Sequence, residues 1–484
     1  MRGNLRSTVN ILGILLMING GFMLLILPFT FIYGEDWIPI AVSSGITLGI
    51  GYLVKFITSS KEHTELKKRD GYLVVTLGWV VLSLSGSLPY VLTGSIPDFT
   101  NAFFETISGY TTTGATILSD IESMPKGILF WRSITQWIGG MGIIVLAVAI
   151  LPLLGIGGMQ LFVAEAPGIT TDKLKPRIQD TAKRLWYIYV GFTVAEFVLL
   201  IFGGMNFFDA INHSLTTMAS GGFSTKNASI AHFDSAYIHY IIILFMFLAG
   251  ASFTLSYFSF KGKLKKVWAN EEFRIYLFFT ILAATLISIS LYFITDGSIE
   301  KSFREGLFQV VSIITTTGYT TADYTAWNPL LTMVFFALMF VGGSAGSTAG
   351  GVKIVRHLVL FKNSYLEMKR LLNPSAVIPV RLNGNAISQD ITLHVLAFMM
   401  LYLTIFSLSS VALSGMGMDF KSAIGAAASC IGNVGPAIGE VGPSKNFAGV
   451  PDMGKWLLGF LMLIGRLEIF TVLILFIPSF WIRN

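Results

Sequence analysis

Long apolar segments recur along the whole chain. Eight of them contain no Asp, Glu, Lys or Arg: residues 8–33, 37–54, 71–97, 133–164, 236–260, 275–295, 325–352 and 391–418. Two more carry one or two charges, namely 185–208 with Glu196 and 456–482 with Arg466 and Glu468. About 20 apolar residues in a helix cross the hydrocarbon core of a membrane. The pattern therefore predicts ten transmembrane helices, and helices are favoured because backbone groups in lipid must be hydrogen-bonded internally.

The composition agrees with a membrane protein. Of the 484 residues, 53% are hydrophobic and 12% are charged, which is about half the charged share of a soluble domain. The single cysteine, Cys430, excludes an internal disulfide framework and a multi-cysteine metal site, and we expect it to be a small buried residue. The first apolar segment is too long for a secretory signal and is interpreted as a retained helix.

The distribution of basic residues predicts the orientation. When the loops are assigned alternately to two sides, starting with the N-terminus inside, the inside loops hold roughly three times as many Lys and Arg as the outside loops. The net charge of +6 is then a topology signal and not a nucleic-acid signal. Both termini are predicted to be cytoplasmic.

One short pattern occurs four times between the apolar segments. Each copy ends on glycine, and we call these four-residue stretches the glycine loops: Thr111-Thr112-Thr113-Gly114, Ala219-Ser220-Gly221-Gly222, Thr315-Thr316-Thr317-Gly318 and Gly432-Asn433-Val434-Gly435. Fifteen residues before each final glycine stands a phenylalanine: Phe99, Phe207, Phe303 and Phe420. The residue before that phenylalanine is an N-cap type, and a hydroxyl residue lies six before the glycine: Asp98, Asn206, Ser302 and Asp419, then Ser108, Thr216, Ser312 and Ser429. Each copy thus predicts a capped helix of about ten residues, too short to span a bilayer, so the chain must re-enter and return.

The repeat defines the predicted fold class: an all-α polytopic membrane protein with four tandem helix–pore-loop–helix repeats around one pore, plus two N-terminal transmembrane helices. The predicted boundaries are 1–66 for the two extra helices, 67–176 for repeat 1, 177–268 for repeat 2, 269–375 for repeat 3 and 376–484 for repeat 4.

Four glycine loops around one axis suit a monovalent cation. Non-helical backbone at membrane depth is tolerated only where it lines protein or water, and rings of carbonyl oxygens can replace the hydration shell of an ion. Glycine permits positive φ and close backbone approach. The partially negative C-terminal ends of the short helices favour a cation. The loops hold no ring of carboxylates, so Ca²⁺ selectivity is not expected.

The sequences Thr-Thr-Thr-Gly-Ala-Thr (111–116) and Thr-Thr-Thr-Gly-Tyr-Thr (315–320) resemble the K⁺ filters of the Trk/Ktr/HKT superfamily, and the resemblance covers nearly the whole chain. The two helices before the first repeat resemble the Trk branch, since the Ktr branch lacks them. The resemblance implies that the glycine loops are a K⁺ selectivity filter, with Gly114, Gly222, Gly318 and Gly435 as its glycines. In plant relatives a serine in the first loop accompanies Na⁺ preference, so Gly114 fits K⁺. The fourth loop departs most from the Thr-rich pattern, with Asn433, Val434 and Pro436.

The resemblance also implies how the protein works. It implies K⁺ uptake across a bacterial inner membrane through a gated, channel-like pore, in a homodimer with one pore per protomer. A cytoplasmic TrkA-type ring would regulate it, and a nucleotide of the NAD or ATP class is expected on that partner and not on this chain. K⁺ ions in the pore and membrane lipid complete the expected ligands; no covalent cofactor and no nucleic acid are expected.

A small-residue segment is the predicted gate. It comprises Gly342, Gly343, Ser344, Ala345, Gly346, Ser347, Thr348, Ala349, Gly350 and Gly351, and such a composition favours neither a helix nor a packed core. It matches the intramembrane gating loop of the superfamily. Arg466 stands at the matching depth of the fourth repeat, where a charge is costly and usually faces a cavity or a partner. We predict that Arg466 contacts this loop and raises a barrier to cations; the alternative is a pairing with Glu468 or another carboxylate.

Three other interpretations were weighed. Glu105, His213 and Gln309 lie nine residues before three of the glycines, and we interpret them as hydrogen-bonded groups behind the short helices. An H⁺- or Na⁺-coupled carrier, a symporter for example, is the main alternative, although repeats that all run in one direction favour a pore. An enzyme is not expected, because the ionisable residues within the spans are spread over separate repeats. Gly351 is not followed directly by Lys and Ser or Thr, so a nucleotide-binding P-loop is excluded.

Overall fold

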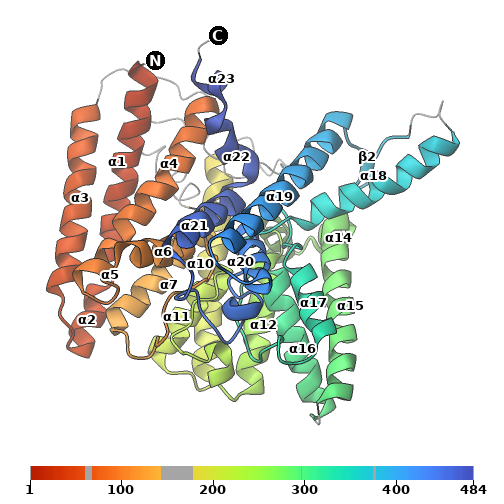
Figure 1. Cartoon of the computed structure of the whole chain (residues 1–484), viewed down its shortest axis with the longest axis horizontal. Coiled ribbons are helices and arrows are strands. Elements are labelled where there is room, and N and C mark those ends of the chain that lie inside the picture. The colour runs from red at the N-terminus through yellow and green to blue at the C-terminus, as the bar shows by residue number, and fades with distance from the viewer. Residues whose placement is uncertain (1, 60–67, 143–177, 296, 374–377, 483–484) are drawn as a thin grey trace.

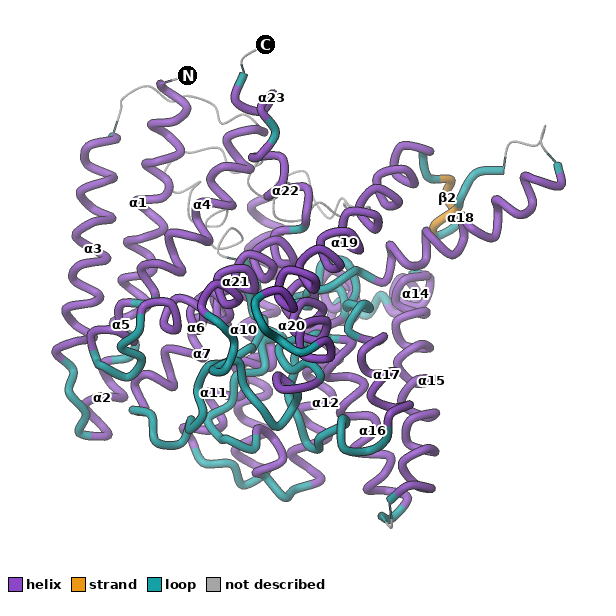
Figure 2. Tube along the Cα trace, in the orientation of Figure 1, coloured by secondary structure: helices purple, strands orange, loops and turns teal. Residues whose placement is uncertain are grey.

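The computed structural model describes residues 2–59, 68–142, 178–295, 297–373 and 378–482. The described chain is almost entirely helical, with one two-residue β-hairpin (Figures 1 and 2). By length and composition, six helices could cross a membrane, or up to eight if each of two bent helix pairs counts as one span. The all-α, multi-pass architecture expected from the sequence is confirmed. α1 begins and α23 ends at the same end of the molecule (Figure 1).

The N-terminal helices pack on each other through small residues. They are α1 (Arg2–Leu24), α2 (Leu27–Tyr33) and α3 (Ile38–Thr58). A Cβ on Gly13 would lie 2.9 Å from the Gly51 carbonyl oxygen, and Ser44 Oγ donates to the Gly20 carbonyl at 2.7 Å. Small residues allow helices this close in a membrane. Asn19 joins α1 to the rest of the fold, because its Oδ1 accepts from Tyr110 Oη at 2.5 Å.

The rest of the chain forms four units, each with a short helix before a glycine loop. The first contains α4 (Lys68–Gly86), α5 (Leu88–Leu92), α6 (Phe99–Tyr110) and α7 (Lys126–Gly140). The second contains α10 (Ile178–Phe202), α11 (Phe207–Met218), η2 (Ser229–His232), α12 (Ala236–Gly250), α13 (Phe253–Phe260) and α14 (Leu264–Ala269). The third contains α15 (Glu271–Ile294), α16 (Ile299–Ile314), α17 (Pro329–Leu338) and α18 (Ile354–Leu372). The fourth contains β1 (Arg381–Leu382), β2 (Asn385–Ala386), α19 (Gln389–Gly415), α20 (Phe420–Gly432), η3 (Gly439–Val441), α21 (Asp452–Leu467), α22 (Ile469–Leu473), η4 (Ile474–Phe476) and α23 (Pro478–Trp481).

The four short helices are α6, α11, α16 and α20, and three of them have the expected caps. The side chains of Asp98, Asn206 and Asp419 accept from the amides of Asn101, Asp209 and Ser422. The expectation that Ser302 caps the third helix is wrong. Ser298 caps it one turn earlier, by accepting from the Lys301 amide, and Ser302 lies buried inside the helix. A cap-type residue four positions upstream therefore extended this helix.

Several predicted spans are broken. The expected span 325–352 is wrong: α17 has ten residues, and non-helical backbone follows until α18. Residues 236–260 form α12 and α13, bent by 107°, and the C-terminal segment forms two parts bent by 115° at Glu468. Most of the predicted span 133–164 lies outside the described residues. The proposed repeat boundaries stay a prediction.

Candidate functional site

The four glycine loops share one backbone conformation. The second residue of each is in the left-handed region, with φ of 53° at Thr112, 54° at Ser220, 55° at Thr316 and 53° at Asn433. The final glycines also have positive φ, between 75° and 98°. In every copy the amide of the third residue donates to the carbonyl of the hydroxyl residue six before the glycine, at 2.8–2.9 Å. The register deduced from sequence offsets is therefore also a structural register.

The loops close into a ring. A Cβ on Gly114 would lie 2.2 Å from the Gly221 carbonyl oxygen, and one on Gly222 would lie 1.9 Å from that of Thr317. A Cβ on Gly318 would meet the Val434 oxygen at 2.1 Å, and one on Gly435 would meet the Thr113 oxygen at 2.5 Å. Each loop thus touches the next, and the fourth touches the first. Glycine is required at these positions for both its positive φ and its missing side chain.

Side-chain hydrogen bonds hold the loops together. Thr111 and Thr113 share a hydroxyl hydrogen bond of 2.8 Å, and Thr315 and Thr317 share one of 2.7 Å. The fourth loop uses Asn433 instead, whose Nδ2 donates to Thr113 Oγ1 at 3.0 Å and to the Met462 carbonyl at 2.9 Å. Asparagine tolerates the left-handed region better than most residues. The departure from the Thr-rich pattern therefore keeps the same backbone and adds a link between the fourth and first loops.

The polar residues nine before the glycines bind the chain where it leaves each loop. Glu105 accepts from Thr116 Oγ1 at 2.9 Å and from the Ile117 amide at 3.0 Å. His213 Nε2 and Ser224 Oγ are 2.9 Å apart, and Gln309 Nε2 donates to the Ala322 carbonyl at 3.1 Å. The interpretation of Glu105, His213 and Gln309 as hydrogen-bonded groups behind the short helices is confirmed.

Two supporting residues were missed by the sequence analysis. Arg132 was assigned to an outside loop, but it lies in α7, is 1% exposed, and pairs with Glu105 at 2.8 Å. Gln136, one turn further along α7, donates from Nε2 to the Gly221 carbonyl at 2.6 Å and accepts from the Phe223 amide at 3.1 Å. Both side chains come from α7 and reach the chain around the second loop. The sequence carried no signal for this contact, because it joins residues about 90 positions apart.

The buried Arg132–Glu105 pair should be a large stability determinant. Removing one partner leaves an uncompensated buried charge, so Glu105→Ala should cost about 3–5 kcal/mol of unfolding free energy. The thermal unfolding of the purified protein in detergent measures this. The exposed pair of Lys445 and Glu440, with side chains 49% and 74% exposed, supplies the control, because Glu440→Ala should change stability by at most about 1 kcal/mol. Equal effects of the two substitutions would contradict the assignment.

The 342–351 loop lies against the glycine loops. Thr348 Oγ1 and Ser220 Oγ are 2.8 Å apart, and the Gly350 amide donates to Thr316 Oγ1 at 2.6 Å. A Cβ on Gly350 would lie 2.8 Å from the Gly432 carbonyl oxygen. The segment therefore touches the second, third and fourth glycine loops. The C-terminal end of α12 anchors it, because the Ser344 amide donates to the Gly250 carbonyl at 2.9 Å.

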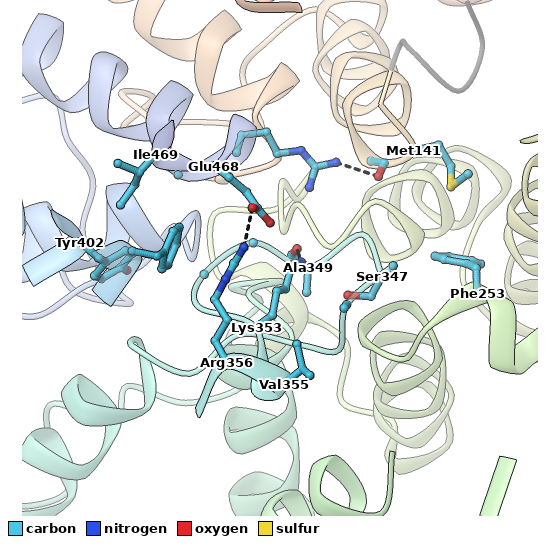
Figure 3. Close-up of a pocket in the computed structure, with 18 of the residues that line it drawn as sticks. Met141, Phe253, Ser347, Ala349, Lys353, Val355, Arg356, Tyr402, Glu468 and Ile469 are labelled. Atoms are coloured by element: carbon cyan, nitrogen blue, oxygen red, sulfur yellow. Dashed lines mark hydrogen bonds and ion pairs between the residues drawn. The ribbon is translucent and has the colours of Figure 1, made fainter. Parts of the chain in front are cut away.

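Arg466 contacts the 342–351 loop, as predicted. Its guanidinium donates to the Thr348 carbonyl at 2.8 Å, and to the carbonyls of Gly139 and Gly140 at 2.5 and 2.8 Å. Glu468, the alternative partner, pairs with Arg356 at 2.5 Å (Figure 3). Arg466 thus joins the loop to the end of α7.

A cavity of about 170 Å³ opens beside this contact. Figure 3 shows Ser347, Ala349 and Lys353 on one wall and Tyr402 and Ile469 on another. Lys353, Arg356 and Arg466 line it together with Glu468, so its described lining carries more positive than negative charge. A cation that left the glycine loops on this side would meet that positive charge next.

A ring of four re-entrant glycine loops inside a helical multi-pass protein defines a pore-loop membrane protein. Residues 44–482 match the TrkH family, described as a cation transport protein. The chain belongs to this family.

Named relatives match over the full length. The Trk system potassium uptake protein TrkH of Halomonas elongata is 41% identical over 99% of both chains. The protein of the same name from Escherichia coli K12 is 42% identical over 98% of this chain and 99% of its own. The crystal structure of the potassium transporter TrkH from Vibrio parahaemolyticus superposes with a TM-score of 0.89 at 40% identity, covering 99% of this chain and 100% of that one.

Proposed function

We propose that this chain takes up potassium through a channel-like pore whose selectivity filter is the ring of glycine loops. The closed ring carries the proposal: four backbones of one conformation, each touching the next. Backbone carbonyls at such a constriction replace the hydration shell of a monovalent ion. The names of its relatives, which are potassium uptake proteins, supply the ion.

The 342–351 loop and Arg466 form the gate in this proposal. The loop lies directly against three of the four filter loops, and Arg466 brings a positive charge to the same place. Cations passing this point lose hydration and meet like charge, which raises their energy. A displacement of the loop together with Arg466 would lower that barrier.

The assembly and the location complete the proposal. The resemblance supports a homodimer with one pore per protomer, controlled by a cytoplasmic TrkA-type ring that binds the nucleotide. The excess of basic residues in the loops assigned inside supports cytoplasmic termini in a bacterial inner membrane.

Growth at low external K⁺ tests the proposal. In a bacterial strain without its own K⁺ uptake systems, this chain together with its ring partner should restore growth. Gly435→Ala should not, because its Cβ would lie 2.5 Å from the Thr113 oxygen, whereas Gly417→Ala, at a positive φ with no atom within 4 Å, should. No rescue by correctly inserted wild-type protein would refute K⁺ uptake.

A further inference from the structure

A basic and aromatic surface surrounds α14, and the proposed pore does not use it. It consists of four exposed lysines, Lys261, Lys263, Lys265 and Lys266, and three exposed apolar side chains, Phe260, Leu264 and Trp268. The apolar three are spaced by four residues and are 69%, 55% and 56% exposed. We call this set the α14 surface.

The α14 surface lies at the end of a helix that faces outward along its length. Figure 2 shows α14 close to end-on at the upper end of α15, the end of the molecule at which α1 begins. Along α15, Phe278, Leu286 and Phe293 are 66%, 59% and 81% exposed, as expected for a helix in contact with lipid. Trp and Lys at the end of such a helix are typical of the membrane–water interface.

The positive charge of the α14 surface has no nearby compensation. Among the described residues, none of its four lysines forms an ion pair with a carboxylate. The two neighbouring acids are engaged elsewhere: Glu271 pairs with Lys362, and Glu272 Oε1 accepts from the Ala345 amide at 2.7 Å. A ligand for this surface must therefore be an anion.

Part of this surface is ordered in advance. Lys261 Nζ lies 5.2 Å from the centre of the Tyr257 ring, and Lys266 Nζ lies 5.0 Å from that of Phe258. Cation–π contacts of this kind restrict the lysine side chains. Lys263 and Lys265 have no such ring contact among the described residues and are the two best placed to reach outward.

We propose that the α14 surface binds the headgroup of an anionic phospholipid. The lysines would contact the phosphate, and Phe260, Leu264 and Trp268 would lie in the acyl-chain boundary, as interfacial amphipathic segments do. The apolar residues decide between occupants, because they continue toward the exposed face of α15, which a soluble acidic partner could not cover.

Retention of lipid by the full-length protein tests the proposal. The wild type and Lys263→Gln/Lys265→Gln are reconstituted in nanodiscs of phosphatidylcholine with phosphatidylglycerol, and phosphatidylglycerol that stays bound after release is counted by native mass spectrometry. Each lysine near an anionic surface changes binding by roughly fivefold, so the double variant should lose at least one tightly held phosphatidylglycerol per protomer. The control Lys301→Gln/Lys421→Gln removes two exposed lysines from loops assigned to the opposite side and should keep it.

Two results would overturn the lipid site. Equal phosphatidylglycerol retention in the test and control variants is the first. The second is loss of retention by the wild type when inorganic phosphate is added at millimolar concentration, because a free anion would then be sufficient to fill the site. Trp268→Ala supplies a second variant that leaves the lysines intact and should also lower retention.

Discussion

Gly318→Ser should destroy most of the discrimination between K⁺ and Na⁺. The new Cβ would lie 2.1 Å from the Val434 carbonyl oxygen and 2.7 Å from Pro436 Cδ, at a φ of +80°. Since neither backbone can yield alone, the third and fourth loops must separate, and the ring loses its fixed width. We expect the K⁺/Na⁺ flux ratio to fall about tenfold or more, which corresponds to only ~1.4 kcal/mol between the two ions.

Gly94→Ser is the matched control for this substitution. Gly94 also has a positive φ, of +73°, but no atom lies within 4 Å of its ideal Cβ. It therefore carries the same backbone strain without a contact to the ring. Paired ⁸⁶Rb⁺ and ²²Na⁺ uptake into proteoliposomes measures both variants. An unchanged ratio in Gly318→Ser would remove the third loop from the filter.

Arg466→Ala should raise the basal K⁺ flux. The substitution removes a positive charge next to the filter and three hydrogen bonds that join the 342–351 loop to α7. Both losses lower the barrier: the electrostatic one directly, and the structural one because the loop loses its hold. We expect a rise of several-fold at equal protein insertion.

Arg466→Lys separates the two causes. Lysine keeps the charge but cannot reproduce the fixed fork of guanidinium donors. Flux near the wild-type level would assign the barrier to the charge, and flux near that of Arg466→Ala would assign it to the hydrogen bonds. A decrease in flux in correctly inserted Arg466→Ala would contradict the role in gating.

The sequence predicted what repeats and missed what joins the repeats. The offsets of the phenylalanine, the cap and the hydroxyl located all four short helices, because a local pattern determines a local structure. The register failed only where a second cap residue competed, at Ser298 in α16. The break after α17 was hidden because small apolar residues keep hydropathy high while they disfavour a helix.

The contacts between repeats could not be predicted from one sequence. Arg132 looked like a loop cation because nothing near it in the chain marks the buried Glu105 as its partner. Asn433 looked like a departure from the filter pattern, yet its Nδ2 joins the fourth loop to Thr113. Arg466 was recognisable because a charge within an apolar span requires a partner, although the identity of its carbonyl acceptors required the structure.

The central claim is that this chain alone forms a K⁺-preferring pore, and ion flux through the purified protein tests it most directly. In liposomes loaded with K⁺, with the membrane potential clamped, the account predicts ⁸⁶Rb⁺ uptake that K⁺ competes away much better than Na⁺ does, and that an imposed pH or Na⁺ gradient does not drive. Uptake driven by an H⁺ or Na⁺ gradient at constant potential would indicate a coupled carrier instead. No flux above protein-free liposomes, or equal competition by Na⁺ and K⁺, would contradict the account.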